Sequence, residues 1–227
     1  MLKSKRFFVH MLVIVMAFSL TSCFHMAEEI FFRKNGSGNY SFTLDMSKVA
    51  SMMEMMGGNN EEMDAAMAEM VREFEKTRDE MAQLEGISNV KMEADKKKLV
   101  FTTSYDFEDL AALNRGMNRF FNHDKEVELE PIEFFTYSGG KLIRTNKDIM
   151  ADALTEAMND DQQVDMDMST VFADVYFETT LKFERGYKKV SNEAYTAPNK
   201  NEIRFKKFLF NDRDLKKSIG VSVTTKM

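Results

Sequence analysis

Cysteine is almost absent from this chain of 227 residues, and Cys23 is the only one. A single cysteine excludes an intramolecular disulfide, so the folded part must be held by packing alone. Proline is equally scarce. Pro131 and Pro198 are the only two, which suits long regular elements. Tryptophan is absent, and the aromatic residues are 20 Phe and 6 Tyr.

Sequence signatures of catalysis are missing as well. The chain has no Gly-x-Ser-x-Gly elbow and no Gly-x-x-x-x-Gly-Lys phosphate loop. After residue 22 the histidines are His25 and His123, far apart and without a matching nucleophile. Carboxylate pairs such as Glu28/Glu29 are common on acidic surfaces, although two carboxylates suffice for some hydrolases. We predict a protein that is not an enzyme, without catalytic or cofactor-binding residues, and keep a hydrolase as an alternative.

Residues 1–22 have the layout of a secretory signal. Three cations precede an apolar run: Lys3, Lys5 and Arg6. The run, residues 7–18, holds about a dozen residues, whereas a spanning helix needs about 20. A permanent transmembrane helix is therefore not expected.

The stretch Leu20, Thr21, Ser22 and Cys23 resembles the lipobox of bacterial lipoproteins. The resemblance implies that the Cys23 thiol receives a diacylglyceryl group, that a peptidase cuts between Ser22 and Cys23, and that the new amine is acylated, for example with palmitate. Two or more acyl chains anchor a protein stably, whereas one chain binds only marginally. The alternative is a secreted protein that is cut after Ser22 and keeps a free thiol.

The chain divides into a signal peptide (1–22), a short tether (23–29) and one domain (30–227). Removal of residues 1–22 takes away three of the 31 Lys and Arg and none of the 37 Asp and Glu, so the net charge falls from −6 to −9. This charge argues against nucleic acid or an anionic lipid surface as the main partner. Phe24, rather than Asp, follows the cysteine. By resemblance to enterobacterial sorting rules, this favours the outer membrane, on its periplasmic or surface face.

The domain reads as a series of hairpins separated by helices. Alternating residues predict hairpins at 30–34/40–46, 87–94/98–105 and 132–137/141–144, and further strands at 171–184, 202–210 and 219–225. This order predicts an α+β fold with a mostly antiparallel sheet. We expect a long Met-rich helix near residues 60–84, with Met63, Met67 and Met70 on a heptad seam, to lie across the sheet. Two shorter helices, near 106–122 and 147–158, would pack beside it.

Methionine is the anomaly of the composition, with 20 residues. The run formed by Met52, Met53, Met55 and Met56 could supply thioethers to Cu(I), so a Met-rich periplasmic copper-binding protein is one alternative. Met is also an adaptable core filler, and a flexible Met face can receive an apolar ligand. Four acidic residues could attract Ca²⁺, but they lack the Gly and the closing Glu of an EF-hand loop: Asp160, Asp161, Asp165 and Asp167.

Three segments carry a further resemblance: residues 31–38, the strand 40–46, and the late strand 181–191. Their layout is similar to putative Bacteroidota lipoproteins of unknown function and to the LppM-like domain, an α+β lipoprotein module linked with lipid binding. Arg185-Gly186 stands where that domain typically has Pro-Gly, and the usual closing transmembrane helix is absent. We therefore expect a membrane-anchored lipoprotein that binds an apolar ligand or a protein partner at the cell envelope, without catalysis.

Overall fold

The structure is a computed structural model that describes residues 25–48, 50–51, 61–121, 130–147, 174–211, 214 and 216–225. Several predicted features lie outside these residues. They are the signal peptide, the lipobox with Cys23, the methionines 52–56, the helix at 147–158 and the acidic residues 160–167.

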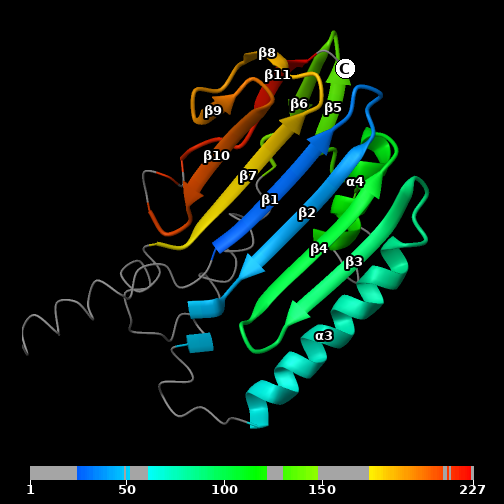
Figure 1. The fold of residues 1–227 in the computed structure, drawn as a ribbon, viewed down its shortest axis with the longest axis vertical. Helices are drawn as coiled ribbons and strands as arrows, with labels where there is room; N and C mark the ends of the chain where they lie inside the picture. The colour runs from blue at the N-terminus through cyan, green and yellow to red at the C-terminus, as the bar shows by residue number, and fades with distance from the viewer. Residues whose placement is uncertain are drawn as a thin grey trace, which may run out of the picture.

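Two β-sheets form the framework (Figure 1). The first has seven strands in the order β3-β4-β2-β1-β7-β10-β9. These are β1 (His25–Phe32), β2 (Gly38–Asp45), β3 (Ile87–Asp95), β4 (Val100–Phe107), β7 (Tyr176–Phe183), β9 (Tyr195–Asn199) and β10 (Glu202–Phe208). The second has four in the order β5-β6-β11-β8, namely β5 (Phe135–Ser138), β6 (Lys141–Arg144), β8 (Tyr187–Val190) and β11 (Val221–Thr225).

All three predicted hairpins are confirmed, as β1/β2, β3/β4 and β5/β6. The α+β class with mostly antiparallel sheets is confirmed too. The exception is the central strand β1, which pairs antiparallel with β2 but parallel with β7, so that Ile30 lies opposite Leu181. The segment 185–201, between the predicted strands 171–184 and 202–210, contains β8 and β9.

Strict alternation gives the seven-stranded sheet one buried and one open face. In β1 the buried side chains are Met26, Glu28, Ile30 and Phe32. We call their side the inner face, and the side of Glu29 and Phe31 the outer face. The Phe32 ring packs against rings of β4, β5 and β7 at centroid distances of 5.7–5.9 Å: Phe107, Phe135 and Phe183. The second sheet therefore covers part of the inner face.

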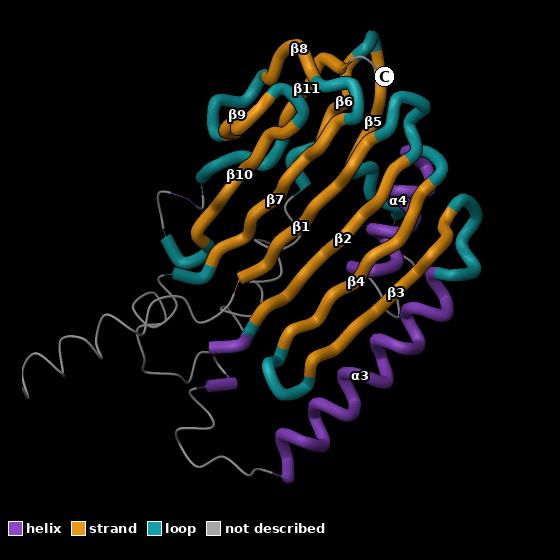
Figure 2. Tube along the Cα trace, in the orientation of Figure 1, coloured by secondary structure: helices purple, strands orange, loops and turns teal. Residues whose placement is uncertain are grey.

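Helix α4 (Leu110–Phe121) covers another part of that face (Figure 2). Asp109 caps it, so the helix begins later than the predicted residue 106: the backbone N–H of Ala112 donates to the Asp109 carboxylate at 2.7 Å. Asp106 is instead the penultimate residue of β4. The apolar side of α4 faces the core, since Leu113 and Met117 are fully buried.

The expected Met-rich helix lying across the sheet is not borne out, and of the two shorter helices only α4 is found among the described residues. The described part of the chain contains two helices, and the longer, α3 (Glu61–Met81), runs beside the edge strand β3 (Figure 1). Along its seam Met81 is buried, whereas Met70 is 36 % exposed. A helix packed at a sheet edge buries a narrow stripe, which here is anchored by Phe74 on Phe101 (centroids 5.5 Å apart).

The tether predicted at 23–29 also needs correction, because β1 begins at His25. Met26 and Glu28 continue the inward alternation of Ile30 and Phe32, so these residues belong to the sheet. In the described ranges, neither helix has the length and hydropathy needed to cross a bilayer.

Candidate functional site

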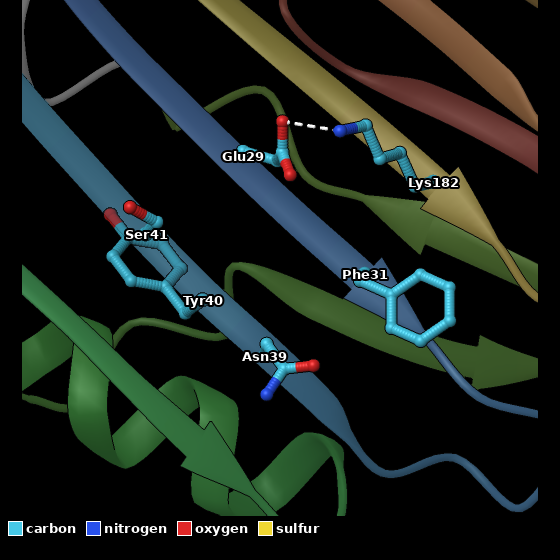
Figure 3. A pocket seen from close by; sticks show the side chains of 6 residues that line it. All are labelled: Glu29, Phe31, Asn39, Tyr40, Ser41 and Lys182. Atoms are coloured by element: carbon cyan, nitrogen blue, oxygen red, sulfur yellow. Dashed lines mark ion pairs between the residues drawn. The ribbon is translucent and has the colours of Figure 1, made fainter. Parts of the chain in front are cut away.

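The outer face of the seven-stranded sheet carries a shallow hollow over β1, β2 and β7. Its volume is about 380 Å³, and Figure 3 shows the residues around it. Glu29 and Phe31 come from β1, Ser41 and Asn39 from β2, and Lys182 from β7. Tyr40 completes the lining, although its ring is buried and stacks on Tyr105 with centroids 4.9 Å apart.

An ion pair forms one wall of the hollow. The Lys182 ammonium lies 2.6 Å from the Glu29 carboxylate (Figure 3). Their side chains are 35 % and 51 % exposed, so both groups remain open to solvent on the rest of their surface. The two opposite charges compensate, and this wall offers both donors and acceptors without net charge.

An aromatic ring and a fixed amide form the other wall. The guanidinium carbon of Arg33 lies 5.7 Å from the centroid of the Phe31 ring, and the same guanidinium donates to the Asn39 side-chain oxygen at 3.0 Å. The Asn39 amide nitrogen in turn donates to Asp106. Because both ends of its side-chain amide are engaged, Asn39 holds one orientation.

Short hydroxyl side chains continue the polar surface from the hollow across β2 and β4. Ser41 lies opposite Ser104, and Thr43 opposite Thr102. The two threonine hydroxyls are 3.4 Å apart. Hydroxyls both donate and accept hydrogen bonds, so this row matches ligands that do the same.

A second polar cluster lies on the inner face, where Glu28 meets Arg144 between the two sheets. The two charges form an ion pair, with side chains 1 % and 5 % exposed. Thr179 donates from its hydroxyl to the Glu28 carboxylate at 2.6 Å and accepts from Arg144 at 3.1 Å. The Arg144 guanidinium also lies 5.1 Å from the centroid of Phe135. Strands β1, β6 and β7 therefore meet at one buried, hydrogen-bonded ion pair.

Burial and charge shift the acidities in this cluster. Burial by itself would lower the pKa of Arg144, but the charge and the hydrogen bond of Glu28, together with Tyr195 and Tyr40, outweigh burial, and the pKa is raised. Burial raises the pKa of Tyr40 well above its usual value, and the Glu28 charge adds to the rise. Burial also raises the pKa of Tyr105. Near neutral pH, Arg144 therefore stays charged, and Tyr40 and Tyr105 stay neutral. All three side chains have a structural role.

Sequence reasoning missed the role of Glu28, which it placed in the tether and among surface carboxylates. The signal that would have found it is the alternation of β1, in which Glu28 is in phase with Met26 and Ile30. The structure does not test the predicted site residues. His25 lies at the start of β1, and the lipobox and the methionines 52–56 are outside the described residues. Among described side chains, no group of three or more His, Cys, Asp or Glu could hold a metal ion.

Comparison with known proteins finds similarity among solved structures only. No family model matches the chain, and no curated protein matches it. Among solved structures, the chain is similar to the NMR structure of the folded domain of LppM from Mycobacterium tuberculosis, with a TM-score of 0.42 and 10% sequence identity over 89% of each chain.

Proposed function

We propose that this protein is a lipid-anchored, non-catalytic binding module of the bacterial cell envelope, whose recognition surface is the hollow on the outer face. The observation that carries the proposal is the hollow itself, where an aromatic ring, a compensated ion pair, a fixed amide and a hydroxyl stand together on three paired strands. Strand-borne side chains hold a site more rigidly than loop residues do.

The composition of the hollow indicates the class of ligand. Glu29 and Lys182 neutralise each other, so a strongly charged ligand gains little there. Phe31 offers an apolar ring, while Asn39 and Ser41 offer donors and acceptors. A neutral molecule with apolar C–H faces and many hydroxyl groups matches this set, and we propose a glycan chain. This ligand is more polar than the apolar ligand expected from the methionine content.

The anchor supports a place at the envelope. Leu20, Thr21, Ser22 and Cys23 fit a lipobox, and no described element is lost when residues 1–22 are removed, since β1 begins at His25. The outer membrane is the proposed location, by the resemblance at Phe24. A module fixed there would meet envelope glycans at high local concentration.

The test is calorimetric titration of the purified lipoprotein in detergent with hexasaccharides of glucose, mannose and N-acetylglucosamine. We expect one of them to bind with a Kd of about 1 mM or tighter. Phe31→Ala should abolish binding and Phe31→Tyr should retain it, while Phe208→Ala, which removes a ring elsewhere on the same face, should leave it unchanged. Absence of binding by all three sugars, or equal binding by Phe31→Ala, would refute the glycan assignment.

A further inference from the structure

The start of β1 fixes which edge of the sheet lies nearest the anchor. His25 is only two residues beyond Cys23, a span of about 7 Å when fully extended. Strand pairing then defines the edge residue by residue. One continuous row of partners runs across six strands: Asp95, Val100, Asp45, His25, Tyr176 and Phe208. We call this row, with the turn 96–98 that joins β3 to β4, the basal edge (Figure 1).

Aromatic rings and a cation gather on one half of the basal edge. The His25 and Tyr176 rings stack with centroids 5.3 Å apart, and Phe208 meets Tyr176 at 5.9 Å. The Lys206 ammonium lies 3.4 Å from the centroid of Tyr176 and 5.0 Å from that of Phe208. Amphipathic rings beside a lysine are the side chains that settle at the headgroup level of a bilayer.

The other half of the basal edge is basic. Lys96, Lys97 and Lys98 form the exposed turn between β3 and β4. The acidic groups of the row are turned into their own loops. Asp45 accepts from the backbone N–H of Ser47 at 2.9 Å, and Asp95 accepts from the N–H groups of Lys97 and Lys98 at 3.1 and 3.0 Å. The Asp95 carboxylate also pairs with the Lys98 ammonium at 3.3 Å, so the net positive charge of the turn rests on Lys96 and Lys97. The lysines stand out in a chain whose net charge beyond residue 22 is −9.

We propose that the basal edge rests on the surface of the anchoring membrane, with Lys96, Lys97 and Lys206 at anionic headgroup phosphates and Tyr176 and Phe208 in the interfacial layer. The proposal rests on the lipid anchor at Cys23. Cationic side chains near an anionic leaflet are attracted to it, and the short span to the acyl chains keeps them within reach. Strand β1 then rises from the bilayer, and the hollow at Glu29 and Phe31 is held away from it.

The lone cysteine makes a direct test possible. In the lipidated protein the Cys23 sulfur carries the diacylglyceryl group as a thioether, so a thiol-reactive fluorophore labels only an introduced cysteine. We would label Lys97→Cys at the basal edge and, as the matched control, Lys34→Cys in the turn at the far end of β1, about 25 Å away. Each protein is reconstituted in phosphatidylethanolamine vesicles with 30% phosphatidylglycerol and a headgroup nitroxide lipid.

We expect several-fold stronger quenching at position 97 than at position 34. The difference should fall when phosphatidylglycerol is omitted, and also in the Lys96→Glu/Lys206→Glu variant, while the protein still floats with the vesicles. Equal quenching at the two positions in floating protein would overturn the basal-edge proposal and leave the anchor intact. Protein that does not float, and whose residue 23 is bare by intact mass, would overturn the anchor and with it the orientation.

Discussion

The buried ion pair between Glu28 and Arg144 links the two sheets, because Glu28 lies in β1 and Arg144 lies in β6. A buried ion pair stabilises little compared with a well-packed apolar pair, but a buried charge left alone is costly. Thr179 bonds to both partners, so it would be left with an uncompensated charge if either were removed.

We predict that Arg144→Met lowers the free energy of unfolding by about 3–5 kcal/mol. The double variant Glu28→Gln/Arg144→Met should recover most of the loss, because no charge is then buried alone. Urea unfolding followed by circular dichroism measures both. Lys182→Met, which breaks the exposed pair with Glu29, should cost no more than about 1 kcal/mol and is the control. A double variant as unstable as the single one would contradict this account.

The two buried tyrosines predict a limit to alkaline stability. Burial raises the folded-state pKa of Tyr40 and Tyr105 above 10.0, so the unfolded chain loses these protons first. Their contribution is fully present below pH 10 and is lost as pH rises further, by up to about 1.4 kcal/mol per pH unit for each tyrosine. Unfolding in urea at pH 9 to 11 should show this slope. The slope should be flatter in Tyr40→Phe/Tyr105→Phe, and an equal slope would disprove the assignment.

At the scale of residues, the sequence predicted burial correctly wherever the alternation of apolar and polar residues could be followed along a strand. Thr179 and Lys207 lie in the strands predicted at 171–184 and 202–210, in phase with buried neighbours, and both are buried. Glu28 was missed because the tether was drawn past the start of β1, and the helix predicted from residue 106 begins only after its cap at Asp109. The hollow was not predictable, since it needs β1, β2 and β7 side by side.

At the scale of elements, the packing of α4 on the sheet depends on Gly116. A methyl group added there would lie 2.6 Å from a ring carbon of Tyr105, which is fully buried. Alanine is the better helix former by about 1 kcal/mol, but overpacking typically costs 1–3 kcal/mol.

We therefore predict that Gly116→Ala lowers stability despite its helix propensity. The exposed Ala111→Gly in the same helix should lower it by only about 1 kcal/mol, through propensity alone. The midpoint temperatures of thermal unfolding of both variants test this prediction. A Gly116→Ala protein more stable than wild type would mean that α4 lies farther from Tyr105 of β4 than the structure shows.

Elements formed by neighbouring segments were predictable, and those formed by distant segments were not. The hairpins β1/β2, β3/β4 and β5/β6 follow from alternation and turn residues within about 20 residues of chain. The pairing of β1 with β7 and the separate four-stranded sheet depend on contacts that no local pattern encodes. The heptad of α3 was visible, but periodicity does not tell whether a seam crosses a sheet or follows its edge.

At the scale of the whole molecule, the lipid anchor gives a simple prediction. Cys23→Ser should yield an uncleaved, unlipidated precursor, whereas Ser22→Ala keeps a small residue before the cysteine and should be processed normally. Intact mass and membrane fractionation check both proteins. A mature-size Cys23→Ser product that still partitions with membranes would contradict the lipoprotein assignment.

The parallel pairing of β1 with β7 has a consequence for how the protein is made. A chain exported from its N-terminus delivers β1 first, yet the second partner of that strand emerges only with Tyr176–Phe183. Until then β1 has one unpaired side, which is a template for aggregation, and the late long-range closure makes folding slow. A nonsense mutation before β7 would therefore release a chain with an open strand rather than a smaller domain.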